Sequence, residues 1–126
     1  MKRLTREWLQ KAESDYRLAE KIAQGTEPFR DHVCFLCQQC AEKYLKALLE
    51  EPGFAVPRTH DLDYLLTLLL PRHPLLRSLR RGLKFLSRFA VGPRYPIFTA
   101  TKREARAALR WAGRVRDAVR PILGVP

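Results

Sequence analysis

Hydrophobic residues recur every three or four positions in five stretches of the chain, and prolines separate these stretches. The nine prolines stand at positions 28, 52, 57, 71, 74, 93, 96, 121 and 126. Because proline interrupts a helix interior, the proline-free stretches predict helices over residues 5–24, 29–50, 59–70, 75–91 and 101–120. No stretch alternates between apolar and polar positions as a half-buried strand would. The fold class is therefore expected to be all-α.

The second stretch is the most apolar of the five. Two adjacent rows run along it, one through Val33, Cys37, Cys40, Tyr44 and Ala47 and the other through Cys34, Ala41, Leu45 and Leu48. A stripe this broad predicts a central helix that contacts several neighbours. Short loops favour antiparallel neighbours. We therefore expect one domain over residues 1–126, an up-and-down bundle of four long helices plus one short helix.

Individual residues predict helix ends and close contacts. Thr5 is a favourable N-cap for the first helix, and Thr101 followed by Glu104 forms a capping-box pattern at the last. Gly82 and Gly113 fall inside predicted helices, where glycine costs about 1 kcal/mol relative to alanine. Their presence indicates that neighbouring helices approach closely at these two positions.

Positive charge is concentrated in the second half of the chain. Residues 1–71 hold 10 Lys and Arg against 11 Asp and Glu, whereas residues 72–126 hold 14 against 2. This asymmetry points to a polyanion or an acidic protein surface as partner. A thermophile-like composition, with no asparagine, one methionine and many arginines, is the alternative explanation. The cations that recur at helical spacing away from the apolar stripes form a predicted basic face, made of Arg80, Lys84, Arg88, Arg106 and Arg110.

Composition also bounds the compartment and the metal chemistry. The longest apolar run, residues 65–70, is too short to span a bilayer, and no signal-peptide pattern follows Met1, so we expect a cytoplasmic protein that does not enter membranes. Cys34, Cys37 and Cys40 have a spacing found in iron–sulfur proteins. They fall within a predicted helix and lack a fourth ligand, so we expect reduced, buried thiols and neither a metal site nor a cofactor.

Motifs for hydrolysis or nucleotide hydrolysis are missing. The chain has no nucleophile elbow, no Walker A sequence, no H-E-x-x-H and no G-x-G-x-x-G. The remaining candidates for a binding site are clusters of polar residues, and each of them also has an ordinary structural interpretation. The first lies on the second predicted helix, where its side chains either bind a phosphate or base edge or form a solvated face: Gln38, Gln39, Glu42, Lys43 and Lys46.

Two further clusters lie outside that helix. Thr59, His60 and Asp61 begin the third predicted helix, where free N–H groups favour an anion and where Thr59 can also serve as a plain cap. Arg94 and Tyr95 lie in a stiff turn between Gly92 and Pro96. That turn either holds both side chains outward for phosphate contact and base stacking or packs Tyr95 inward.

The order of these motifs resembles one known family. The run from Cys34 to Leu49, then Thr59 to Leu62, then Arg94-Tyr95-Pro96 is similar to the HEPN (higher eukaryotes and prokaryotes nucleotide-binding) domain, in its small prokaryotic, nucleotidyltransferase-associated branch. The resemblance implies a helical bundle that is usually a dimer. It also implies a separate minimal nucleotidyltransferase as protein partner, often in a toxin–antitoxin pair.

One activity known in the family is not indicated by this sequence. Other HEPN proteins are metal-independent ribonucleases that carry an Arg-x(4–6)-His motif. No arginine precedes His32, His60 or His73 at that spacing. The resemblance therefore favours a non-catalytic subunit that binds a nucleotide or the substrate of its partner, through Gln38, Gln39, Glu42, Lys43, Lys46, His60, Asp61, Arg94 and Tyr95. The alternatives are a ribonuclease toxin with an atypical site and a basic adaptor that binds RNA.

Apolar residues beside the main stripes predict assembly. The chain has more apolar helical surface than one short bundle is expected to bury, and this surface includes Phe85, Phe89 and Phe98. We therefore expect a homodimer or a larger oligomer.

Overall fold

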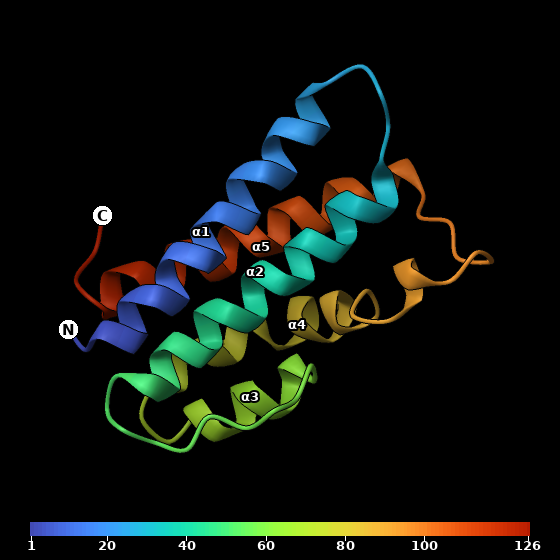
Figure 1. Ribbon diagram of the computed structural model, residues 1–126. Helices are drawn as coiled ribbons and strands as arrows, with labels where there is room; N and C mark the ends of the chain where they lie inside the picture. The colour runs from blue at the N-terminus through green and yellow to red at the C-terminus, as the bar shows by residue number, and fades with distance from the viewer.

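Five α-helices and two short 3₁₀ helices make up the structure, a computed structural model that describes residues 1–126 (Figure 1). The elements are α1 (Arg3–Gln24), α2 (Arg30–Glu50), α3 (Leu62–Leu69), η1 (Pro74–Leu79), α4 (Arg80–Ser87), η2 (Gly92–Arg94) and α5 (Lys102–Ile122). No strand is present. The predicted all-α helical bundle is confirmed.

Helix α2 is the central element of the bundle. It contacts α1, α3, α4, α5 and η2, and α1 lies alongside it in the opposite direction (Figure 1). Thirteen of its 21 residues are buried, among them Cys34, Cys37 and Cys40, each with 0% of its surface exposed. The apolar rows therefore predicted both the central position of this helix and the burial of its thiols.

The fourth predicted helix is shorter than its hydrophobic pattern indicated. Residues 75–91 divide into η1 and the eight-residue α4. Pro74 opens η1 as its first residue, and bonds to the third preceding residue tighten the chain again after Ser87, as in Phe89 N–H to the Leu86 carbonyl at 3.0 Å. The bundle thus has three long helices and two short ones.

One connection departs from the up-and-down order. After α2 the chain runs back along that helix, so that His60 lies beside Gln38 and Glu42 in its middle. At the other end of α3, the Arg72 guanidinium lies 5.1 Å from the ring centre of Phe54, close to the end of α2. Helix α3 therefore runs parallel to α2, and the returning loop brings His60 onto the central helix.

Both helix-interior glycines lie at close contacts, as predicted. A Cβ on Gly82 would lie 2.0 Å from ring atoms of Trp111, so only glycine lets α4 approach α5 at that point. A Cβ on Gly113 would lie 3.1 Å from the Tyr16 hydroxyl of α1. The predicted capping box at Thr101 and Glu104 is also present.

The predicted cap at Thr5 is wrong. Helix α1 begins at Arg3, with Lys2 at its N-cap position, three residues before Thr5, and Thr5 lies inside the helix. The Lys2 amine donates to the Glu50 carbonyl at 3.0 Å, so contacts with the end of α2 accompany the earlier start. Thr5 is fully buried there and its hydroxyl has no hydrogen-bond partner.

The three phenylalanines that suggested an oligomer pack within the chain. Phe89 is fully buried, and its ring centre lies 5.2 Å from that of Phe85 and 5.9 Å from that of Phe98. These rings stabilise the contact of α4 with the loop before α5. Phe85 and Phe98 are each partly buried against the core.

Candidate functional site

A polar stripe follows one face of α2. His32, Phe35, Gln39, Glu42 and Lys46 are spaced three or four residues apart, and at 3.6 residues per turn they share one side of the helix. We call these five residues the α2 polar face. The loop before α3 covers one end of it, and the loop containing η2 covers the other.

Glu42 is the centre of a buried network on this face. Its carboxylate accepts hydrogen bonds from the Gln38 amide at 3.0 Å and the Lys46 ammonium at 2.9 Å, and His60 Nδ1 lies 2.8 Å from the same carboxylate. Gln38, Glu42 and Lys46 are exposed by 0%, 5% and 7%. Buried charges survive when they are paired and hydrogen-bonded in this way.

The network keeps Glu42 ionised and orients His60. Burial works to raise the pKa of Glu42, but the hydrogen bonds from Gln38, Lys46 and His60 together hold that pKa below its usual value. An ionised carboxylate only accepts hydrogen bonds, so Nδ1 of His60 carries the donated proton. Because 57% of the His60 side chain is exposed, Nε2 is the nitrogen left to meet a ligand.

Lys46 itself is not available to a ligand. Its ammonium is shielded from solvent, paired with Glu42, and 5.7 Å from the ring centre of Trp8. The Trp8 N–H is buried without a hydrogen-bond partner. Lys46 therefore holds the carboxylate that positions His60.

Three more of the sequence candidates have structural contacts. The Gln39 amide donates to Gln38 Oε1 at 2.7 Å, which extends the Glu42 network toward the surface. Asp61 is the N-cap of α3 and accepts the Tyr64 N–H at 3.1 Å. Lys43 faces α1 and pairs with Asp15 at 2.6 Å, so it is separate from the Glu42 network.

At the other end of the α2 polar face, Arg94 lies over Phe35. The guanidinium carbon is 5.4 Å from the ring centre, within the range of a cation–π contact. The two residues line a small cavity of about 180 Å³ with Asp31, His32 and Pro93. The Asp31 carboxylate accepts a hydrogen bond from the Ala100 N–H at 2.7 Å. Arg94 forms no ion pair in the structure, and Tyr95 is 58% exposed.

The structure thus places most of the candidates in two groups on one helix face, while Lys43 faces α1. One group surrounds Glu42 and His60, and the other surrounds Phe35 and Arg94. Ten residues of α2 separate His32 from Glu42, which is about 15 Å of helix at 1.5 Å per residue. Sequence reasoning did not select His32 and Phe35. The three-and-four spacing that joins them to Gln39, Glu42 and Lys46 is the signal that could have found them.

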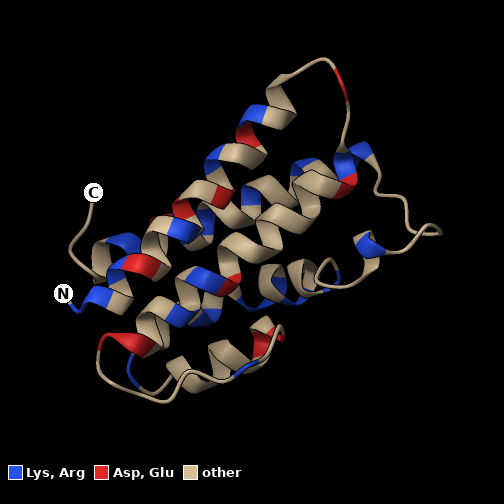
Figure 2. Cartoon of the chain, in the orientation of Figure 1, with Lys and Arg blue, Asp and Glu red and all other residues tan.

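The five cations of the predicted basic face differ in their surroundings. Arg80 is paired with Asp63, and Arg88 is paired with Glu104 at 3.0 Å while stacking on Phe85 and Phe89. The exposed members without an ion pair are Lys84, Arg106 and Arg110. Figure 2 shows basic residues on each long helix, with acidic residues beside many of those on α1. Two of the five charges are therefore neutralised locally.

The three cysteines lie apart from any cluster of metal-ligating side chains. No group of three or more His, Cys, Asp or Glu side chains is placed to hold a metal ion. Burial raises the pKa of the Cys34 thiol to about 12, which opposes formation of the thiolate that a metal requires. None of the helices is both long and apolar enough to cross a membrane.

Comparison with known proteins agrees with the fold. The family model of the HEPN domain matches residues 5–122. The chain belongs to the HEPN domain family. The crystal structure of TT1696 from Thermus thermophilus has a TM-score of 0.78 and 29% identity, covering 91% of this chain and 94% of that one. The structure of ST0689, an archaeal HEPN homologue, has a TM-score of 0.75 and 29% identity, covering 98% and 99%. No curated protein matches the sequence.

Proposed function

We propose that this HEPN protein is a non-catalytic subunit that binds a nucleotide along the α2 polar face. Its partner would be a separate minimal nucleotidyltransferase, and the two would form a toxin–antitoxin pair. The observation that carries the binding proposal is the placement of two outward groups, Arg94 and His60 Nε2, over one stripe of α2. The partner rests on the family resemblance of the sequence.

The Arg94 end has the chemistry of a phosphate site. A guanidinium matches phosphate oxygens through two parallel donors. Arg94 is exposed and has no carboxylate partner, while Phe35 supports its flat side. The one carboxylate in the adjoining cavity, Asp31, keeps its negative charge, but it accepts the Ala100 N–H and forms no ion pair with Arg94. A phosphate therefore meets a free cation there.

The His60 end has groups that suit a base or a sugar. His60 Nε2 is available, and the neighbouring Gln39 amide is half-buried on the same face. Both groups hydrogen-bond to polar edges. The buried Glu42 network fixes His60 in place, so a ligand would meet a preorganised donor or acceptor.

The arrangement favours binding over catalysis. Cleavage of a phosphodiester needs a cation beside the general base to stabilise the developing charge. The lysines nearest His60 are paired, Lys46 with Glu42 and Lys43 with Asp15. Arg94 contacts Phe35, nearly two helical turns from Glu42. Arg58, in the loop before His60, is exposed, and no hydrogen bond or ion pair holds it beside the His60 ring.

Calorimetric titration with AMP and ATP tests the binding proposal. We expect saturable binding that Arg94→Gln weakens about tenfold, the scale of one charge-assisted pair. Arg103→Gln is the matched control, because Arg103 is an exposed arginine of α5 without an ion pair. Equal affinities of the two variants, or no saturable binding, would contradict the proposal.

One observation favours a second function, a ribonuclease with an atypical site. Glu42 orients His60 as a carboxylate orients a catalytic histidine, with Nε2 facing solvent. If this candidate is right, the pure protein cleaves RNA in the presence of EDTA, and His60→Ala abolishes the cleavage. Uncleaved RNA under those conditions would rule out the ribonuclease function.

We also propose that the protein forms a homodimer. Exposed apolar side chains gather in and beside the η2 loop, where Ile97 is 95% exposed, Tyr95 58% and Val91 49%. Light scattering at micromolar concentrations tests this, and Ile97→Asp is expected to shift the protein toward monomer. A wild-type protein that stays monomeric would contradict it.

A further inference from the structure

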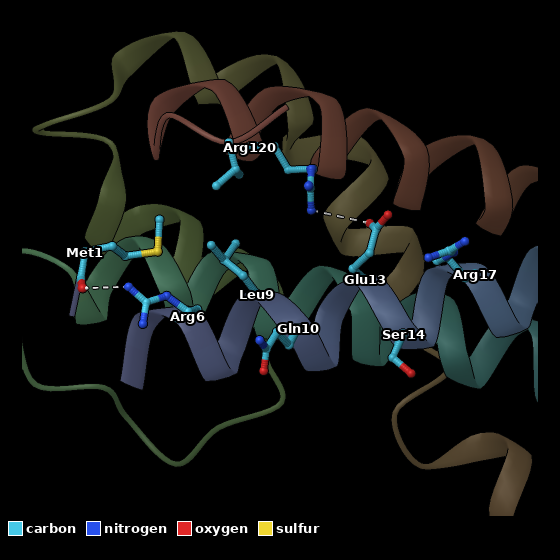
Figure 3. A pocket seen from close by; sticks show the side chains of 9 residues that line it. Met1, Arg6, Leu9, Gln10, Glu13, Ser14, Arg17 and Arg120 are labelled. Carbon is cyan, nitrogen blue, oxygen red and sulfur yellow. Dashed lines mark hydrogen bonds and ion pairs between the residues drawn. The ribbon is translucent and has the colours of Figure 1, made fainter. Parts of the chain in front are cut away.

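A second cavity, separate from the α2 polar face, lies between α1 and the end of α5. Its volume is about 590 Å³, within the range of small-molecule sites. None of the residues of the α2 polar face lines it. Figure 3 shows Glu13 between Arg17 and Arg120 toward one end, and Met1 and Arg6 at the other, with Leu9 between the two groups.

Positive charge dominates the Arg17 end. Arg17 is exposed and forms no ion pair, although Glu13 lies one turn before it on α1. Arg120 is only 18% exposed in its side chain, and its guanidinium contacts the Tyr44 hydroxyl at 3.2 Å and Glu13 at 3.6 Å. The cavity therefore presents one free guanidinium beside one that is held in place.

The carboxylate at this end does not cancel that charge. Two nitrogens of Arg116 bind both oxygens of Glu13, at 2.6 and 2.7 Å. The hydrogen bonds from Arg116 hold the pKa of Glu13 at about 2, and burial acts in the opposite direction. Arg116 also lies 3.5 Å from Asp117, so the three guanidiniums of Arg17, Arg116 and Arg120 face two carboxylates, and the potential at the Arg17 end stays positive.

The apolar part of the lining is aliphatic. Met1, Leu9 and Val125 supply it, and Leu9 is 5% exposed. No aromatic side chain lines the cavity, so it lacks a stacking surface for a nucleobase. This chemistry differs from that of the α2 polar face, where Phe35 lies under Arg94.

We propose that this cavity binds a small aliphatic anion. Its carboxylate or phosphate head would lie at Arg17 and Arg120, and its hydrocarbon body would cover Leu9 beside Met1 and Val125. Binding neutralises the free guanidinium and removes aliphatic surface from water, and both contributions favour the complex. The site does not depend on nucleotide binding at α2.

Calorimetry with four probes tests this inference. Octanoate and octyl phosphate carry both head and body, acetate carries a head alone, and 1-octanol carries a body alone. We expect one octanoate or octyl phosphate per chain, bound at least tenfold more tightly than either acetate or 1-octanol. The stronger of the two octyl ligands identifies the head group as carboxylate or phosphate.

Two substitutions decide whether the binding occurs in this cavity. Arg17→Gln is expected to weaken octanoate binding about tenfold, whereas Arg103→Gln on α5 leaves it unchanged. Arg17→Lys keeps the charge and is expected to retain most of the affinity, which separates a charge effect from a change in folding. Equal binding of 1-octanol and octanoate, equal effects of Arg17→Gln and Arg103→Gln, or no saturable binding would each overturn the proposal.

Discussion

Two glutamates anchor polar networks in this protein, and their partners differ in kind. Glu13 binds Arg116 through both oxygens, accepts the Tyr44 hydroxyl at 2.6 Å and lies 3.6 Å from Arg120. Those partners join α1 to α2 and α5. Glu42 instead binds two neighbours on its own helix and the exposed His60 of a loop.

The difference separates a structural network from a candidate site. Every partner of Glu13 lies on one of the long helices, so the network connects the bundle. The Glu42 network directs one side chain outward, with 57% of the His60 side chain exposed and one ring nitrogen free. Substitutions in the two networks should therefore affect stability and binding in different proportions.

The largest expected loss of stability comes from Glu42→Gln. It leaves the Lys46 ammonium buried, with 7% exposure and no anionic partner. Breaking a buried pair in this way costs about 3–5 kcal/mol. Urea unfolding measures the loss, and Glu42→Gln combined with Lys46→Met is expected to recover part of it. A double variant no more stable than Glu42→Gln alone would show that the unpaired charge is not the cause.

Glu13→Gln should cost somewhat less, about 2 kcal/mol, because this pair is partly exposed to solvent. The folded-state pKa of Glu13 is about 2, below its usual 4.5. The ionised carboxylate therefore stabilises the fold above about pH 4.5, and that contribution is lost as the pH falls toward 2. Unfolding curves at several pH values should show the wild type and Glu13→Gln converging below pH 4. A gap that stays constant with pH would contradict the assignment.

A small effect on stability is expected from His60→Ala, within about 1 kcal/mol, because most of the ring is already in water. AMP affinity should nevertheless fall several-fold, since the ligand loses the contact to Nε2. Tyr64→Ala, a truncation of an exposed side chain on α3, serves as control. Unchanged AMP affinity in His60→Ala would show that the His60 end of the α2 polar face does not contact the nucleotide.

The smallest effect on stability is expected from Arg106→Glu with Arg110→Glu. Both side chains are exposed and form no ion pair. If the protein binds RNA through this part of the predicted basic face, affinity falls steeply between about 50 and 200 mM salt and is lost in the double variant. Filter-binding assays measure both effects. Binding unchanged by the charge reversal would identify these arginines as a solvated surface.

Local patterns in the sequence predicted much of the fold. The apolar rows of residues 29–50 indicated a central helix, since helical periodicity depends only on neighbours along the chain. Gly82 and Gly113 indicated close helix contacts because glycine destabilises a helix interior and is expected there only where a neighbour needs the space. The division of residues 75–91 was not predictable from periodicity, because a 3₁₀ turn and an α-helix bury similar spacings of leucine.

The candidate site was less predictable because its pairings are long-range. Lys43 and Lys46 lie three residues apart, yet one pairs with Asp15 of α1 and the other with Glu42 of its own helix. His60 reaches Glu42 because the loop turns back along α2. The Leu62 N–H donates a hydrogen bond to the Ser87 side-chain hydroxyl at 3.0 Å, which joins the start of α3 to α4. Contacts of this kind leave no periodic signal.

The central claim is that the α2 polar face binds a nucleotide at both of its ends. Chemical-shift mapping of the ¹⁵N-labelled protein with AMP tests it most directly, because it locates the ligand without any substitution. We expect shifts at His32, Gln39, His60 and Arg94, and none at Glu13 or Arg116. Saturable shifts confined to another surface, or no shifts at millimolar AMP, would contradict the account.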